Sequence, residues 1–428
     1  MKKMIILTCL GLLLISGTAV AQAQGDSGEI EALRKLVQEQ NARISDLLSR
    51  IEALEAKQGE QGEWIETEKE SEKKEAEWTE RIVLKGDFRY RYEWIDDDRE
   101  KEDRNRNRIR ARVGLEAKLN DTTDLGFQLS TSEPNGRGAE GDPISNNQTL
   151  TNSFSLKNIW LSQAYFDWHP AQAPGLHVLG GKVYYPFYAP GKSELIWDAD
   201  LTPEGGVIKY AKSFDSVDAF GNLYGFWVLE RSQDADSGLF GAQGGAKLNF
   251  EAFGDKAYVL GGLGYFDFGN VEGERPFFDN TGKSFGNTLV GNVLAEDFDE
   301  LELFGEFGFK AKEIPLLLFA HYVTNVAANG EDDGWLVGLG VGKAKEPGDW
   351  EAKYTYRVLQ RDAVLGGFTN SDFGRGGTDA KGHEIGIAYQ LAKNWQVVAK
   401  YFNNETGIGI GEDEEDYEKV QLDLNFKF

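Results

Sequence analysis

An alternation of apolar and polar residues runs from Arg81 to the last residue, and it constrains the fold of this chain more than any other feature. The alternating segments are about 9–14 residues long and are separated by turn residues, which is typical of β-strands. The C-terminal segment, YEKVQLDLNFKF, shows it most clearly, with one apolar and one polar face. We count sixteen segments, which begin near residues 82, 107, 124, 157, 175, 204, 215, 238, 255, 297, 314, 334, 349, 381, 394 and 417.

The connections between these segments sort by length. Those after even-numbered segments are short turns, namely NDTT, PAQAP, SFD, AFG, KEI, EPG and a turn near Lys393 and Asn394. Those after odd-numbered segments are long, at 95–106, 134–156, 184–203, 231–237, 269–296, 326–333, 362–380 and 406–416. Short turns at one rim and long loops at the other are typical of an outer-membrane barrel whose short turns face the periplasm.

The sequence therefore predicts an all-β fold over 81–428, a 16-stranded antiparallel transmembrane β-barrel preceded by a short N-terminal α-helical coiled coil. Both ends of the barrel segment would then lie on the periplasmic side. Fourteen or eighteen strands also fit, because the boundaries around 175–212 are soft. A soluble sandwich would alternate as well, but its loops would not sort by length.

The N-terminus resembles an export signal over residues 1–23. Lys2 and Lys3 precede an apolar stretch, and Ala21-Gln22-Ala23 is a small-x-small cleavage pattern. The alternative is an uncleaved anchor. Cys9 lies in the apolar stretch, so the cleaved chain would have no cysteine and no disulfide. The expected location is the outer membrane of a Gram-negative cell, with the N-terminal segment in the periplasm.

Residues 24–57 carry a heptad seam that predicts a periplasmic coiled coil, followed by a charged linker over 58–80. Two or three helices would satisfy this seam, and a single amphipathic helix lying on another surface is the alternative. The seam residues are Ile30, Leu33, Val37, Gln40, Ile44, Leu47, Ile51 and Leu54.

The formal net charge of −25 excludes nucleic acid as a partner. Acidic runs such as Asp96-Asp97-Asp98 lie in predicted outer loops. They are either simply solvated or bind divalent cations that bridge lipopolysaccharide. Outer-membrane lipid and lipopolysaccharide are therefore the expected surroundings.

Charged residues of one sign recur at a period of two on the predicted inner face. On a lipid-facing surface each arginine would cost about 2–4 kcal/mol near the midplane, so these residues must face water or the rim. The basic wall, on the first and second strands, consists of Arg89, Arg91, Arg104, Arg106, Arg108, Arg110 and Arg112. The acidic wall, on the tenth strand, consists of Glu300, Glu302 and Glu306.

In a barrel of sixteen strands, the second and tenth strands are opposed. The two walls would then create a field across a water-filled lumen that favours polar or charged solutes. The alternative is local pairing of the arginines with Asp87, Glu93, Glu116 or an infolded loop, which would make the cluster structural.

The third long loop, roughly 184–203, combines aromatic residues with Glu194, Asp198 and Asp200. This composition suits a loop that folds into the lumen and constricts it. A cap packed on the outer rim is the alternative.

No pattern in the sequence predicts an enzyme, a metal site or a cofactor. His169, His177, His321 and His383 lack metal-ligand spacing, and no glycine-rich loop has a phosphate-binding context.

Three segments resemble a known family. The first strand GDFRYRYEW with the arginine-rich second strand, the DADLTPEGG segment and the terminal aromatic strand resemble the bacterial putative porins, relatives of the general porins and of the alginate-export channels. The resemblance covers roughly 81–428 and implies passive diffusion of small hydrophilic solutes, often through a homotrimer.

The resulting prediction is a porin for small hydrophilic, charged solutes, with ion transport by passive diffusion. One alternative is a substrate-specific channel for an anionic solute or an acidic saccharide. Another is a barrel-anchored structural tether that reaches the cell wall through its coiled coil.

Overall fold

The computed structural model describes residue 28 and residues 31–53, 81–135, 140–277, 283–409, 411 and 413–428. The chain divides into two units, Met1–Glu80 and Arg81–Phe428. The predicted signal peptide (1–23) and charged linker (58–80) lie outside the described residues.

In the first unit, residues 31–53 form a helix, as the sequence predicts. Its seam residues are about half exposed, with Leu33 at 53% and Leu47 at 56%. Ile30 and Leu54, the ends of the seam, lie outside the described residues, and association of the helix with copies of itself stays a prediction. No helix among the described residues is long and apolar enough to cross a membrane.

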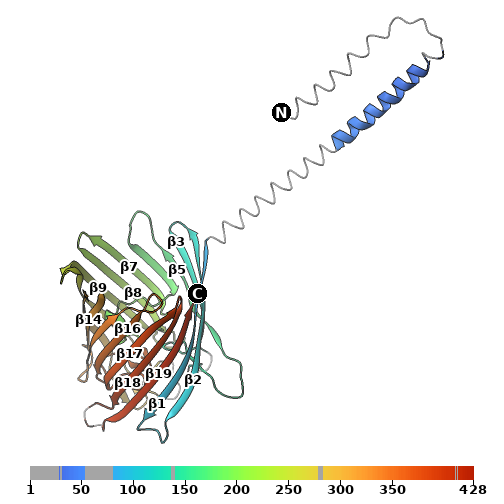
Figure 1. The fold of residues 1–428 in the computed structure, drawn as a ribbon. Coiled ribbons are helices and arrows are strands. Elements are labelled where there is room, and N and C mark those ends of the chain that lie inside the picture. The colour runs from blue at the N-terminus through green and yellow to red at the C-terminus, as the bar shows by residue number, and fades with distance from the viewer. Residues whose placement is uncertain are drawn as a thin grey trace. The chain divides into compact units, whose positions relative to one another are not determined.

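The second unit is a closed barrel of 16 antiparallel strands (Figure 1). Each strand pairs with its neighbours in the chain, and β1 pairs with β19 to close the ring, with Phe88 opposite Phe426. The strands are β1 (Ile82–Asp97), β2 (Arg104–Asn120), β3 (Thr123–Thr131), β5 (Ile159–Trp168), β6 (Leu176–Lys182), β7 (Glu204–Phe214), β8 (Val217–Leu229), β9 (Ser237–Ala252), β10 (Asp255–Gly269), β13 (Phe298–Ala311), β14 (Ile314–Asn325), β15 (Asp333–Gly342), β16 (Trp350–Leu359), β17 (Ala380–Ala392), β18 (Trp395–Thr406) and β19 (Glu415–Lys427).

Short elements lie in the long loops. The two-residue strand β4 (Gln148–Thr149) pairs with β2, and β11 (Leu289–Val290) pairs with β12 (Val293–Leu294). Single 3-10 turns occur at Pro190–Lys192 and Gly366–Phe368. The loops that carry them all connect strands at the long-loop rim.

Strand number and loop sorting agree with the sequence prediction, and the counts of fourteen and eighteen strands are wrong. Observed strands begin within about three residues of the predicted positions. Two hairpins at the short-turn rim use two-residue turns with positive φ at both positions, Phe253-Gly254 and Lys312-Glu313. Such turns match the twist of the paired strands and allow the tight reversal.

The outer face of the barrel is apolar and the main core lies inside it. Leu84 and Leu263 point outward and are 59% and 58% exposed, as expected of side chains that meet lipid. Inside, apolar side chains from β6 to β16 pack against the loop at 183–203 and against residues 363–365, and this inner core includes Leu179, Phe226, Phe266, Phe319 and Leu336. The lumen is therefore partly filled on this side, which the alternation pattern alone does not predict.

Candidate functional site

Six of the seven arginines of the basic wall come together on the inner faces of β1 and β2. The antiparallel register places Arg89 opposite Arg110 and Arg91 opposite Arg108. Opposed residues of neighbouring strands point to the same face, so these side chains form one continuous patch. Arg104, the seventh, lies at the outer end of β2, where it is exposed.

Two carboxylates on β1 pair with these arginines. Asp87 accepts from Arg110 at 2.9 Å and from Arg112 at 2.7 Å. Glu93, which is fully buried, lies 3.4 Å from Arg91 and 3.7 Å from Arg108. It also pairs with Arg106.

Other carboxylates complete the pairing of the basic wall. Asp423 on β19 lies 2.6 Å from Arg91. Glu116 instead contacts Lys85, at 2.5 Å. Local pairing, the structural alternative, therefore holds for Asp87 and Glu93 and does not hold for Glu116.

The loop at 183–203 lies inside the barrel and reaches the basic wall through Asp200. The Asp200 carboxylate is 3.7 Å from Arg110 and 3.5 Å from Arg112, and it accepts the backbone N–H of Asn146 at 3.1 Å. Burial raises the pKa of Asp200, but the nearby arginines outweigh this and hold the pKa at about 2. Asp200 therefore stays ionised at any physiological pH.

An aromatic anchor holds the middle of this loop against the opposite wall. Trp197 is 4% exposed and stacks on Phe187, with ring centroids 4.3 Å apart. It meets Phe266 of β10 edge-on at 5.0 Å. The loop thus spans the lumen, with Trp197 on the apolar side and Asp200 on the basic side.

Glu194 and Asp198 tie this loop to the loop at 360–379. Glu194 accepts the Asn370 side-chain amide at 2.8 Å, and Asp198 accepts the backbone N–H of Ser371 at 3.0 Å. Burial, reinforced by Glu194 and Asp200, raises the pKa of Asp198 well above its usual range. Two long loops are therefore joined inside the barrel.

The acidic wall on β13 points inward, but loops cover most of it. Glu300 accepts the backbone N–H of Leu365 at 2.9 Å, and Glu306 accepts that of Gly191 at 2.7 Å. Glu300 is 1% exposed and Glu302 is 0% exposed. Glu300 and Glu306 thus hold the backbone of two loops. Because Glu300 and Glu302 meet protein rather than water, they do not present charge to the lumen, contrary to the sequence expectation for them.

A buried chain of hydrogen bonds attaches the loop at 183–203 to β14. The Ser193 hydroxyl is 3.0 Å from His321 Nδ1, and His321 Nε2 is 2.8 Å from Glu302. All three side chains are at most 4% exposed. The sequence does not predict this contact, because the three residues lie on separate segments of the chain. The contact attaches the loop to the barrel wall.

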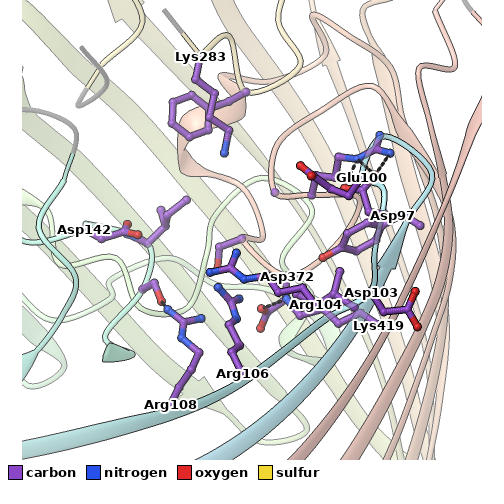
Figure 2. Close-up of a pocket in the computed structure, with 18 of the residues that line it drawn as sticks. Asp97, Glu100, Asp103, Arg104, Arg106, Arg108, Asp142, Lys283, Asp372 and Lys419 are labelled. Carbon is purple, nitrogen blue, oxygen red and sulfur yellow. Dashed lines mark hydrogen bonds and ion pairs between the residues drawn. The ribbon is translucent and has the colours of Figure 1, made fainter. Parts of the chain in front are cut away.

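Above the basic wall, an outer cavity of about 980 Å³ opens among the long loops. Figure 2 shows Arg106 and Arg108 extending into this cavity from β2, with Lys283 across from them and Asp142 to the left. Its charged lining contains six cations and six carboxylates: Arg104, Arg106, Arg108, Lys283, Arg375 and Lys419, with Asp97, Glu100, Glu102, Asp103, Asp142 and Asp372. Lys419 Nζ is 2.6 Å from Asp372, which lies in the loop at 360–379.

A second, inner cavity of about 240 Å³ lies along the inner faces of β15 to β18. Lys353 and Arg357 of β16, Glu384 of β17 and Lys400 of β18 line it, together with Glu194 of the infolded loop. No motif in the sequence marks these residues as a set. The only signal was the period of two in KYTYR, where Lys353 and Arg357 share a face.

A closed barrel with an apolar outer face, a charged inner wall and infolded loops defines a channel-type barrel of the bacterial outer membrane. The chain belongs to the family described as "Putative porin", whose model matches residues 98–288 and 290–428. It is thus an outer-membrane porin.

Solved structures with a similar fold are porins. OprB of Pseudomonas putida, in its high-pH structure, shares 11% identity with a TM-score of 0.54, over 82% of this chain and 96% of that one. OmpF of Salmonella typhi, in complex with daunomycin, shares 14% identity with a TM-score of 0.48, over 81% of this chain and 97% of that one. At these identities the likeness to OprB concerns the fold alone. No curated protein matches the sequence.

Proposed function

We propose that this porin passes small hydrophilic, charged solutes by passive diffusion and that the basic wall makes anions the favoured ones. The observation that carries the proposal is the charge balance of the wall. Its six inner arginines and Lys419 outnumber the five carboxylates in contact with them among the described residues: Asp87, Glu93, Asp200, Asp372 and Asp423. An excess of fixed positive charge beside a narrow aqueous path raises the local concentration of anions.

The loop at 183–203, with Glu194, Asp198 and Asp200, acts in this proposal as the constriction. Its apolar part packs on the side formed by β6 to β16. The outer cavity lies beside β1, β2 and β19, and the inner one lies beside β15 to β18, at the edge of the apolar side. Solutes would therefore pass along the charged side of the lumen.

We further propose that the porin is a homotrimer whose N-terminal helices associate in the periplasm. The half-exposed seam residues of the helix at 31–53 support this, because a lone helix would leave them in water. Lipopolysaccharide would surround the outer loops, and the helices could extend toward the cell wall.

Single-channel recording in planar bilayers under a salt gradient tests the charge proposal. Replacing Arg106, Arg108 and Arg110 together by Gln shifts the reversal potential toward cation preference. As a control, replacing the exposed Lys101 of an outer loop by Gln leaves the reversal potential unchanged. A folded triple variant with unchanged reversal potential contradicts the proposal, and a folded wild-type barrel with no conductance favours the structural tether.

A further inference from the structure

Three arginines of β2 form a row along one side of the outer cavity. Arg104, Arg106 and Arg108 alternate with other residues, so their side chains leave the same face of the strand at intervals of about 7 Å. Among the described residues, Glu93 is the only carboxylate within 4.0 Å of a side-chain nitrogen of these arginines. Glu93 is 0% exposed, so it contacts the row from within the protein.

The protein holds two of these guanidinium groups in place. Arg106 Nε donates to Glu93. Arg108 Nη2 donates to Ser145 Oγ and to the Asn147 carbonyl oxygen, both at 3.3 Å. Because these contacts restrict the rotation of both side chains, the two guanidinium groups are positioned before a solute arrives, which lowers the entropic cost of binding.

The remaining terminal nitrogens of these two groups are accessible. Arg106 Nη1 and Nη2 and Arg108 Nη1 have no hydrogen-bond partner in the described part of the chain, and none of them is among the nitrogens that the protein covers completely. Arg108 Nε is covered in this way and is not available to a solute. Both arginines line the outer cavity and point into it in Figure 2, so three donors from two guanidinium groups face this space.

The carboxylates in the rest of the lining are paired or solvated. Asp97 pairs with Arg375, and Asp372 pairs with Lys419 at 2.6 Å. The other acids of the lining, apart from Asp142, lie in the exposed loop between β1 and β2, where water solvates them. The accessible donors on β2 are therefore both fixed in position and without a partner among the described residues.

We propose that the outer cavity binds a small dicarboxylate, with one carboxylate on Arg106 and the other on Arg108. A guanidinium group holds a carboxylate by charge-assisted hydrogen bonds, and two such groups about 7 Å apart match an anion with two separated charges. The cavity of about 980 Å³ has the size of a small-molecule pocket and admits a five-carbon dicarboxylate together with water. This inference rests on the proposed function, because it places a binding step at the outer end of the diffusion path.

Block of the channel current by glutarate tests the proposal with the full-length protein. Glutarate has two carboxylates and butyrate has one, and the potassium salt of each is added to a constant potassium chloride background. Extra potassium chloride is the control for ionic strength. The wild type shows a saturable decrease in current with glutarate, at a half-blocking concentration about tenfold lower than that of butyrate.

Two variants and a control connect this difference to the row on β2. Arg106→Lys and Arg108→Lys keep the positive charge but remove the terminal guanidinium donors. Each raises the half-blocking concentration of glutarate about tenfold, so that it approaches that of butyrate. Arg231→Lys is the matched control, since Arg231 lies in the loop between β8 and β9, pairs with Glu274 at 3.4 Å and lines neither cavity. Folding of each variant is checked by the heat-dependent electrophoretic mobility of the barrel.

The outcomes separate the two proposals. A folded wild type without conductance overturns the proposed function. In a conducting channel, equal half-blocking concentrations of glutarate and butyrate overturn the dicarboxylate site. The site is also overturned if both Arg106→Lys and Arg108→Lys keep the wild-type difference between the two anions, or if Arg231→Lys removes that difference.

Discussion

Removing the aromatic anchor of the infolded loop widens the lumen. Trp197 stacks on Phe187 at 4.3 Å, meets Phe266 at 5.0 Å and is 4% exposed. Replacing a buried tryptophan by alanine typically costs about 3–5 kcal/mol, which corresponds to a factor of a hundred or more in an equilibrium constant. In Trp197→Ala this cost weakens the packing of the loop at 183–203 inside the barrel. The backbone hydrogen bonds between the strands are not altered.

Single-channel conductance measures the result directly. Trp197→Ala is expected to conduct more than the wild type and to show transitions between a low and a high level as the loop docks and leaves. Trp227→Ala is the matched control, since Trp227 lies on the lipid-facing side of β8 and is 64% exposed. A folded Trp197→Ala barrel with wild-type conductance and no added transitions would refute the reasoning that this loop constricts the lumen.

Three further predictions concern ion pairs and the helix. Glu93→Gln leaves buried arginines without their shared carboxylate and lowers the free energy of unfolding by about 3–5 kcal/mol, measured by urea denaturation in detergent, whereas Glu100→Gln in an exposed loop changes it little. Asp200 has a pKa of about 2, below that of an ordinary aspartate. Its contacts with the arginines are therefore fully present when the pH is above the ordinary aspartate pKa, and they are lost as the pH falls toward 2. Conductance is therefore steady down to pH 4 and rises below pH 3, and Asp200→Asn abolishes this transition. Leu47→Lys, in the exposed seam, decreases chemical cross-linking between helices of neighbouring chains, and unchanged cross-linking would count against the coiled coil.

The strand pattern could be predicted from the sequence because it depends on local alternation and on loop length. Each strand must present apolar residues to lipid, so its period of two is visible without knowledge of its neighbours. Tyr90 and Arg91 illustrate this, since Tyr90 is 37% exposed on the outside and Arg91 is 3% exposed on the inside. The same rule predicts that the arginines of β1 and β2 face inward.

The covering of the acidic wall could not be predicted, because it depends on the path of the long loops. The Glu300 carboxylate accepts a hydrogen bond from the backbone N–H of Leu365. No periodic pattern in the sequence between these residues indicates that they are in contact. The inner cavity was missed for a similar reason. Arg357, Glu384 and Lys400 lie on three strands, and only the register of β16 to β18 brings them to one place.

The local pairing of the arginines was one of two alternatives in the sequence, and ion pairs with Asp87 and Glu93 are present in the structure. Glu93 is shared among Arg91, Arg106 and Arg108. Arg91 also contacts Asp372 and Asp423, so these carboxylates hold the three guanidinium groups close together.

The reversal potential of the wild-type porin in a potassium chloride gradient tests the central claim most directly. Our account predicts a measurable single-channel conductance with a reversal potential displaced toward that of chloride, because the basic wall outweighs its carboxylates. A conducting channel whose reversal potential lies at that of potassium would contradict the account.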